Sequence, residues 1–268
     1  MNRSRSVALG VVAVAFAVLP AAAEPDPAAT ESDANGDEPT LRGQGMFYGW
    51  IPAMLTGSFT LGQDSASVQA NTADLIRHLK FTVGLRGEAW HGQLGLLVDW
   101  FYAKLGGERS FEQVGVNTEI TQGLGAAALA YRLATWPTSR DPRAMRISAD
   151  AYAGVRVSRF DVNIHVGPGS HARGETLVDP IIGMRIPLQL SPTWQMAVRG
   201  DVGGFGADSD VVWNFEFAFE QNVTPAVGLE LGYRIMDIEF SSDAGDTTKQ
   251  VLMKTLTHGP VLAASYAF

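Results

Sequence analysis

The sequence lacks the features that carry most kinds of protein chemistry. It contains no cysteine, which excludes disulfide bonds and thiolate metal sites. Its five histidines show no metal-ligand spacing on one face. No glycine-rich run continues into the Lys-Ser/Thr and helix of a phosphate loop. We therefore predict no metal site, no cofactor and no catalytic residues.

Long apolar runs are also missing, apart from one at the N-terminus. Arg3 and Arg5 precede an apolar segment at 7–19, and Ala21-Ala22-Ala23 offers a small-residue cleavage site. This order is typical of a signal peptide, and the apolar segment is too short for a membrane helix. We predict a cleaved signal peptide at 1–23 and export from the cytoplasm. No later segment approaches 18 consecutive apolar residues, so no helical membrane span is predicted.

Basic residues are outnumbered by acidic ones. Removing Arg3 and Arg5 from the 20 Lys and Arg residues leaves 18 against 28 Asp and Glu, a net charge of −10. An acidic exported chain is a poor nucleic-acid binder. Residues 24–45 are rich in Pro, Ala, Asp, Glu and Thr without apolar periodicity, which predicts a disordered lead-in. After cleavage about 245 residues remain, enough for one domain, which we assign to 46–268.

The chain does have a strong two-residue periodicity. In the run Val211 to Glu220 every odd position is apolar or aromatic, whereas the even positions include Asn214, Glu216 and Glu220. Such alternation gives a strand one apolar face and one polar face. The apolar face is unusually aromatic, and the pattern recurs up to Phe268. We predict an all-β fold, a closed antiparallel up-and-down transmembrane β-barrel with its apolar face toward lipid.

The alternation supports about ten strands, with eight or twelve as alternatives. Pro52 predicts a bulge or a weakly paired point in the first strand. We expect one or two helical turns at 72–79, a hairpin turn at His91-Gly92, and polar loops at 106–118 and 161–176. Short connections alternate with longer ones, which places both termini on the periplasmic side. The predicted strands are 46–60, 81–90, 94–102, 119–133, 145–157, 182–190, 194–202, 211–220, 227–235 and one ending at 268.

The inward positions of these strands carry seven arginines and seven carboxylates but no lysine. Arginine stays ionised and forms two-pronged hydrogen bonds with carboxylates, and a ten-stranded barrel is narrow inside. We predict a salt-bridge network that fills the lumen; the alternative is a merely solvated polar lining. The predicted members are Arg86, Glu88, Asp99, Arg132, Arg146, Asp150, Arg156, Arg185, Arg199, Asp201, Glu216, Glu220, Glu230 and Arg234.

Several motifs together resemble a family of largely uncharacterised bacterial outer-membrane β-barrel proteins. They are the run 200–206 (Gly-Asp-Val-Gly-Gly-Phe-Gly), Gly232-Tyr233-Arg234, Gly259-Pro260, terminal Tyr266-Ala267-Phe268, and the segment from Asp74-Leu75 through Arg86-Gly87-Glu88 to Asp99. The resemblance spans roughly residues 46–268 and implies the barrel fold, but it indicates nothing about a ligand. It also implies that Tyr266 and Phe268 form the C-terminal aromatic signal that the barrel-assembly machinery reads.

Two polar groupings could in principle carry chemistry. His165, Ser170, His171 and Glu175 share one predicted loop, as a lipid hydrolase would require, but a polar surface loop explains them better. Carboxylates near the predicted outer rim could bind divalent cations that bridge lipopolysaccharide, or could act as in rim proteases. These rim residues are Asp208, Asp210, Asp237 and Glu239, with His258 at a similar level.

The sequence thus predicts where the protein sits better than what it does. We expect a small barrel in the cell outer membrane, structural or surface-binding, and not an enzyme. A narrow channel for ions or small solutes is the first alternative, and a lipid or peptide hydrolase at the rim is the second. The expected partners are outer-membrane lipid and lipopolysaccharide, the assembly machinery during biogenesis, and divalent cations at the rim, but no nucleic acid.

Overall fold

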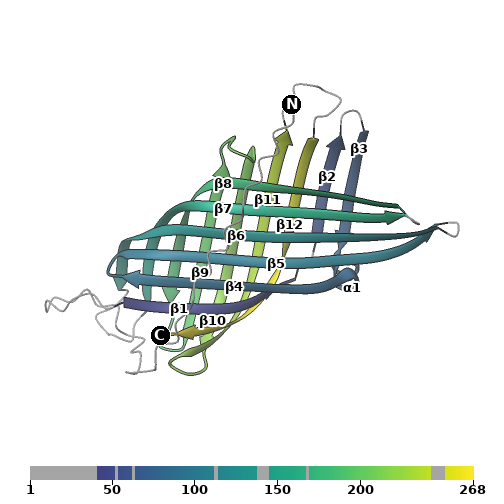
Figure 1. Ribbon diagram of the computed structural model, residues 1–268. Helices are drawn as coiled ribbons and strands as arrows, with labels where there is room; N and C mark the ends of the chain where they lie inside the picture. Colours follow the sequence, from purple (N-terminus) through teal and green to yellow (C-terminus); the bar gives the residue numbers. More distant parts are fainter. Residues whose placement is uncertain are drawn as a thin grey trace.

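The computed structural model shows a closed antiparallel β-barrel (Figure 1). It describes residues 41–51, 54–61, 64–111, 114–137, 145–166, 169–242 and 251–268, so the predicted signal peptide and most of the lead-in lie outside the described residues. The elements are β1 (Leu41–Trp50), β2 (Met54–Leu61), β3 (Asp64–Asn71), α1 (Thr72–His78), β4 (Leu79–His91), β5 (Leu94–Phe111), β6 (Val114–Pro137), β7 (Arg146–Val166), β8 (Gly169–Gln189), β9 (Trp194–Gly204), β10 (Val211–Asn222), β11 (Val227–Ser242) and β12 (Val251–Ala267).

The barrel wall has ten strands, which confirms the predicted fold and strand number. Each strand from β4 to β12 pairs with the next, and β1 closes the circle by pairing with both β4 and β12. β2 continues the first strand along the same partner, because β12 pairs with β1 from Ala267 to Val261 and with β2 from His258 to Val251. β3 forms a hairpin with β2, and α1, which confirms the predicted helical turns, leads into β4.

The first strand is interrupted between Trp50 and Met54. Pro52, where the sequence predicted a bulge, lies outside the described residues, but Ile51 still donates its N–H to the Pro260 carbonyl at 3.0 Å. At the other end β1 begins at Leu41 rather than at residue 46, so 41–45 belongs to the barrel and not to the lead-in. Gly43 and Phe268 exchange two backbone hydrogen bonds of 2.9 Å, which fixes the C-terminal residue against the first strand.

Side-chain alternation follows the predicted faces. On β10, Phe215, Phe217 and Phe219 are about 40% exposed, whereas Glu216 is 2% and Asn214 3% exposed. Large apolar side chains are exposed on nearly every barrel strand, while charged side chains are buried inside. Water would penalise so continuous an apolar surface, and a bilayer would not. Among the described residues, no helix has the length and apolarity needed to cross a membrane.

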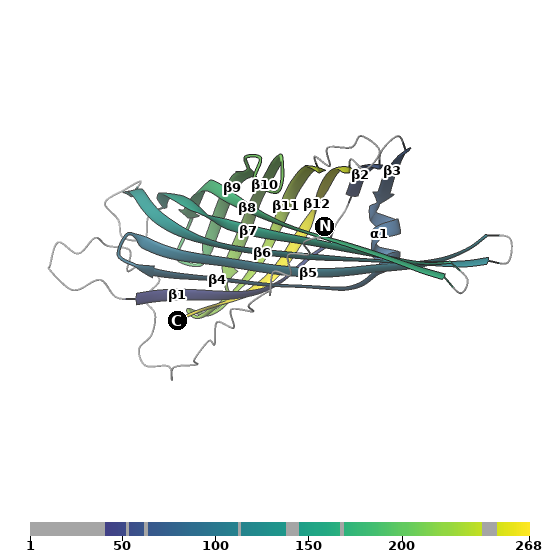
Figure 2. The same ribbon diagram turned by 45° about the horizontal axis from the view of Figure 1, so that its top comes forward.

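Two predicted loops are instead strand. β5 and β6 stay paired as far as Phe111 and Val114, and β7 and β8 as far as Val166 and Gly169. Both hairpins project past the neighbouring strands, as Figures 1 and 2 show. The prediction of loops at 106–118 and 161–176 was wrong because polar, glycine-rich sequence does not show apolar alternation even where the backbone pairs fully.

One turn is shifted by a single residue. His91 is still in β4 and pairs with Leu94, so the two turn residues are Gly92 and Gln93 rather than His91 and Gly92. Gly92 has a positive φ of 60°, as the first position of a tight hairpin turn requires. In the short turn between β8 and β9, the Ser191 hydroxyl accepts a hydrogen bond from the Trp194 N–H at 3.1 Å.

Candidate functional site: the lumen of the barrel

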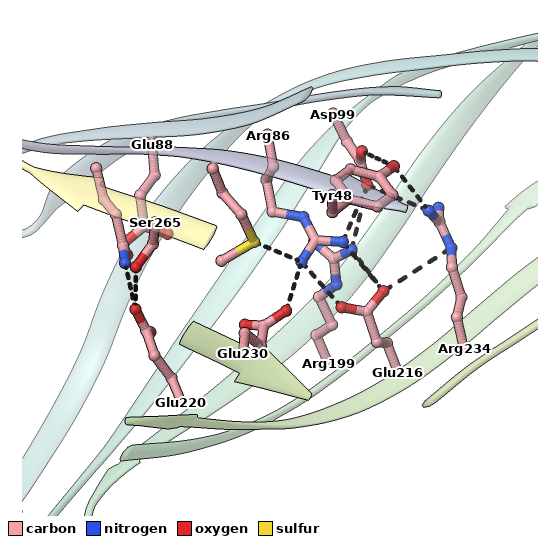
Figure 3. A network of polar contacts seen from close by, with 12 residues as sticks. Tyr48, Arg86, Glu88, Asp99, Arg199, Glu216, Glu220, Glu230, Arg234 and Ser265 are labelled. Carbon is pink, nitrogen blue, oxygen red and sulfur yellow. Dashed lines mark hydrogen bonds and ion pairs between the residues drawn. The ribbon is translucent and has the colours of Figure 1, made fainter. Parts of the chain in front are cut away.

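A cluster of five charged side chains lies at the centre of the lumen (Figure 3). Glu216 accepts two hydrogen bonds from Arg86, of 2.9 and 3.1 Å, and one of 2.9 Å from Arg199. Asp99 lies 3.1 Å from the Arg199 Nη2 and 3.5 Å from Arg86 and Arg234. Three arginines from β4, β9 and β11 therefore share two carboxylates from β5 and β10. Such sharing gives each guanidinium at least one carboxylate partner where water is scarce, although the buried Nε atoms of Arg86 and Arg199 donate no hydrogen bond.

Tyr48 and Asn214 complete this cluster. The Tyr48 hydroxyl donates to Asp99 Oδ1 at 2.6 Å and accepts from Arg234 Nη1 at 3.3 Å. Asn214 Oδ1 accepts from Arg234 Nε at 2.8 Å. The guanidinium of Arg86 also lies over the Tyr48 ring, 5.0 Å from its centroid. The sequence did not assign Tyr48 to the site, because its strand mixes glycines with aromatic residues and its facing was ambiguous.

A second cluster surrounds Asp150, which is fully buried. Arg132 Nε donates to Asp150 Oδ1 at 2.8 Å, and Arg185 Nε donates to Oδ2 at 3.3 Å. Arg185 also pairs with Glu88. The Trp90 indole lies between both arginines, with guanidinium carbons 4.6 and 5.5 Å from its ring centroid. Cation–π contacts of this kind add to the ion pairs where both partners are desolvated.

Arg156 and Asp201 form a third, separate pair. Arg156 Nη1 lies 2.8 Å from Asp201 Oδ1, and both side chains are 4% exposed. The Tyr152 hydroxyl donates to the second Asp201 oxygen at 3.1 Å, and the Asn214 amide reaches the same atom at 3.3 Å. Asn214 therefore links this pair to the central cluster.

Two predicted members are placed differently. Glu220 accepts hydrogen bonds from the Gln44 amide at 3.0 Å and from Ser265, and within the described part of the chain it forms no ion pair. Arg146 opens β7 opposite Gln189, at the end of the barrel where the turns are short. The remaining twelve predicted residues all take part in ion pairs.

Three inward aromatic rings pack over glycines of a neighbouring strand. A Cβ atom at Gly84 would overlap the Tyr48 ring, one at Gly95 would overlap Trp90, and one at Gly183 would overlap Tyr152. Each glycine is paired with, or next in register to, the residue carrying the ring. The missing side chains give these large rings room to lie flat against the wall and to reach the charged clusters.

An apolar layer closes the lumen beside the charged clusters. It was not predicted, because the sequence-based expectation was a polar interior throughout. Trp50 and Phe101 pack together with ring centroids 5.2 Å apart. Side chains from across the barrel join them, all at most 6% exposed: Tyr48, Ala103, Leu124, Leu177, Val212, Met236, Ile238, Met253 and Val261. This layer lies toward the end of the barrel that carries the long hairpins. On β5, Phe101 follows Asp99 toward that end, and on β10, which runs away from that end, Val212 precedes Glu216.

A cavity of about 140 Å³ remains on the charged side of this layer. Its walls include Arg86, Glu216 and Arg234 of the central cluster together with Glu220 and Glu230. The lumen therefore contains space at the end with the short turns, but the apolar layer separates that space from the opposite end.

The rim residues do not assemble into a catalytic site. His258 lies on the outward face, where its Nδ1 contacts the Tyr233 hydroxyl at 2.5 Å. Asp208 accepts a hydrogen bond from the Val178 N–H at 2.8 Å, so its carboxylate caps the edge of β8. Among the described residues, no group of three or more His, Asp and Glu side chains is arranged to hold a metal ion. Asp237 and Glu239 lie on the outward face of β11 with Asp210 beside them, since the Asp210 N–H donates to the Glu239 carbonyl at 2.9 Å.

The predicted hydrolase loop is a β-hairpin. His165 is the register partner of Ser170, and Ile164 is that of His171. The side chains of His165, Ser170 and His171 lie outside the described residues, whereas Glu175 is described and contacts other groups. The hairpin therefore brings a histidine and a serine into adjacent backbone positions without a described third group.

Exposed ion pairs mark the outward face beyond the apolar belt. Lys104 Nζ and Glu119 Oε1 are 2.8 Å apart on β5 and β6. Their hydrogen bond raises the pKa of Lys104 and lowers the pKa of Glu119, so both stay ionised at neutral pH. Arg159 and Asp161 form a similar pair of 2.7 Å on β7. Charges at this level suit the boundary between hydrocarbon and headgroups better than the hydrocarbon itself.

Comparison with solved structures identifies the fold. The barrel is similar to the outer-membrane protease OmpT from Escherichia coli, with a TM-score of 0.50 and 9% sequence identity over 86% of this chain and 97% of that chain. This likeness shows a bacterial outer-membrane type of β-barrel. It is also similar to the attachment invasion locus protein Ail of Yersinia pestis, with a TM-score of 0.37 and 11% identity over 85% of this chain and 99% of that one.

At such identities the likeness establishes the fold alone. No protein-family model matches the sequence, and the comparison with curated proteins found no match. Barrels of one architecture host unrelated functions, so protease activity stays with OmpT and is not transferred to this chain.

Proposed function

We propose that this chain is a closed outer-membrane barrel with a structural or surface-binding role, exported by a cleaved signal peptide. The filled lumen carries the proposal. Arg86, Arg199 and Arg234 are bound to carboxylates from opposite walls, and the apolar layer around Trp50 and Phe101 lies beyond them. An ion crossing this barrel would have to break buried ion pairs and then pass a desolvated apolar layer, and both steps are costly.

The outer hairpins support the surface-binding role. β5 to β8 extend as a four-stranded sheet beyond the point where β8 begins to pair with β9, at Ile181 and Gly203. This sheet is not needed to close the barrel, and segments that project from a rigid scaffold often carry the binding residues of a protein. Function in such a protein therefore concentrates on the projecting sheet rather than in the lumen.

Conductance of the purified chain in a planar bilayer tests the proposal. A closed barrel inserts without stable unitary current steps, with a general porin inserted under the same conditions as the positive control. Reproducible unitary steps would instead support the alternative function, a narrow channel for ions or small solutes.

The proposed location has its own test. Outer-membrane lipid and lipopolysaccharide would surround the belt that includes Phe215 and Phe217, and the assembly machinery would read Tyr266 and Phe268 at the C-terminus. Divalent cations bridging lipopolysaccharide would lie near Asp237 and Glu239. Fractionation of expressing cells should recover the chain, without residues 1–23, in the outer membrane. Recovery of a folded chain in the soluble fraction would contradict the proposed location.

A further inference from the structure

Glu220 and Glu230 face each other across the lumenal side of β10 and β11. They are register partners in the antiparallel pair, and their exposed fractions are 8% and 9%. Like charges at directly opposed positions destabilise a sheet, and burial increases their repulsion because water no longer screens it. A buried pair of this kind either binds a proton or needs a positive charge close to both carboxylates.

Within the described part of the lumen, a single arginine forms an ion pair with either of the two glutamates. Arg86 Nη1 forms a long ion pair with Glu230 Oε1, at 3.7 Å, but it lies 2.9 Å from Glu216 and is therefore shared with the central cluster. Glu230 Oε1 is buried and accepts no hydrogen bond in the structure. Among the described residues, Glu220 accepts hydrogen bonds from two neutral donors, the Gln44 amide and the Ser265 hydroxyl. Figure 3 shows Glu220 and Ser265 facing each other.

The cavity beside these two carboxylates is lined by one carboxyl group more than it has arginines, which is an excess of one negative charge when every carboxyl group is ionised. Five arginines and six carboxylates line it: Arg86, Arg156, Arg185, Arg199 and Arg234 against Glu88, Asp99, Asp201, Glu216, Glu220 and Glu230. Its volume of about 140 Å³ leaves room for a small ion with some of its water. The charge excess, the space and the unsatisfied Glu230 oxygen occur at one place.

We propose that this cavity binds one small monovalent cation, an alkali metal ion or ammonium, between Glu220 and Glu230. Carboxylate oxygens are the hard ligands that such ions prefer. The Ser265 hydroxyl can add a lone pair, and the Gln44 amide offers its carbonyl oxygen if it turns over, since the two ends of an amide are interchangeable in shape. One positive charge balances the cavity, whereas a divalent ion would leave an excess of the opposite sign.

The ion reaches this site from the end of the barrel with the short turns. Glu220 lies close to the end of β10 at Asn222, and Gln44 lies near the start of β1. The apolar layer closes the other direction, because an ion passing Trp50 and Phe101 would lose its hydration without gaining polar contacts. Binding and release therefore do not require conduction, and the site is compatible with a closed barrel.

Thermal unfolding of the purified full chain in detergent tests this site. Sodium, potassium or ammonium chloride replaces N-methyl-D-glucamine chloride at constant ionic strength and pH, so that general screening is unchanged. We expect a saturable rise in Tm with at least one small cation, of about 3–6 °C at ten times the half-saturating concentration. Glu220→Gln and Glu230→Gln should lose this rise. The exposed Glu119→Gln variant, which lies outside the cavity, should keep it.

Two results would overturn the proposal. One is a Tm that does not distinguish small cations from N-methyl-D-glucamine; a shared proton would then balance the pair. The other is an equal rise in Glu220→Gln and Glu230→Gln. If these variants do not fold, equilibrium dialysis of the unmodified chain with radioactive rubidium decides: one displaceable ion per barrel supports the site, and none rejects it.

Discussion

At the scale of single residues, Glu216 is the carboxylate on which the lumenal network depends most. It is 2% exposed and is bound by Arg86 and Arg199, with Arg234 3.9 Å away. Glu216→Gln keeps the shape but removes the charge, which leaves three buried guanidinium groups sharing Asp99. We expect the free energy of unfolding to fall by about 3–5 kcal/mol, measured by denaturant titration in detergent.

The matched control for this change is Glu119→Gln. Glu119 also pairs with a basic residue, Lys104, but the pair lies on the outward face beyond the apolar belt, so solvent screens it and its loss should destabilise the barrel far less than the loss of Glu216. If Glu216→Gln and Glu119→Gln lowered the free energy of unfolding equally, burial would not explain the contribution of the lumenal ion pairs to stability.

Tyr48 provides a second prediction at this scale. Its hydroxyl donates to Asp99 and accepts from Arg234, and its ring fills the space over Gly84. Tyr48→Phe keeps the ring and removes only the hydroxyl, leaving buried polar partners unsatisfied. The loss should be about 1–3 kcal/mol in unfolding free energy by the same titration. A Tyr48→Phe barrel as stable as the parent would show that water replaces the hydroxyl there.

Residue-level prediction succeeded where alternation was clean and failed where it was not. The sequence predicted correctly that Glu216 points into the lumen and Phe217 points outward, because charged and aromatic residues alternate on β10. Val211-Val212 and Ile235-Met236 place apolar residues at consecutive positions, so the inward members of the apolar layer could not be told from outward ones. The inward position of Trp50 could not be predicted either, because the neighbouring Gly49 has no side chain that would indicate which face of the strand is polar. Which inward charge contacts which depends on three-dimensional proximity across the lumen, as between Arg86 and Glu216, and sequence spacing does not encode it.

At the scale of elements, the loop between β9 and β10 is held by the edge of β8. Asp179 is fully buried and accepts hydrogen bonds of 2.7 Å from both the backbone N–H and the hydroxyl of Ser209. Phe205 within this loop has a positive φ of 52°, an uncommon conformation for a bulky residue that the surrounding contacts must maintain. The carboxylate therefore fixes both the loop and the local backbone.

Asp179→Ala should release this loop without opening the barrel. We expect amide hydrogen exchange of residues 205–210 to accelerate by about 5–150-fold, because two buried hydrogen bonds to one carboxylate contribute about 1–3 kcal/mol. Exchange on β10 away from the loop should be unchanged. If that strand also accelerates equally, the contact supports the whole wall rather than the loop.

The projecting hairpin of β7 and β8 gives the second prediction for an element. β8 pairs with β9 from Ile181 onward. Among the described residues of the hairpin tip, 162–166 pair with β6 on one side and with 169–173 on the other, and 169–173 pair with β7 alone. Replacing 162–173 by Asn-Gly should leave the folded barrel intact, seen as unchanged heat-dependent gel mobility. If the projecting sheet is the binding surface, attachment of expressing cells to host or matrix surfaces should fall to the vector background. Unaltered attachment would move the binding role elsewhere.

At the scale of the whole molecule, the barrel inverts the usual order of a soluble protein, with charges inside and apolar residues outside. The strand number, the outward faces and the position of the C-terminal Phe268 could be predicted, because each follows from period-2 alternation in a single chain. The division of the interior into a charged and an apolar layer could not, because the lumen of a barrel is filled by side chains from all strands at once. The filling of the lumen therefore depends on side chains from many strands together and cannot be predicted from the pattern of any one strand.

That division makes a prediction about conductance. If two independent layers close the lumen, weakening one should not open it. Arg199→Leu should lower the thermal unfolding temperature, since Glu216 and Asp99 lose a partner, yet planar-bilayer recordings should still show no unitary steps. Trp50→Ala with Phe101→Ala should likewise stay closed, because the arginine and carboxylate pairs remain. The triple variant, Arg199→Leu with Trp50→Ala and Phe101→Ala, loses both the large rings of the apolar layer and one arginine of the charged cluster. Unitary steps should then appear. Steps from Arg199→Leu alone would show that the apolar layer does not exclude ions.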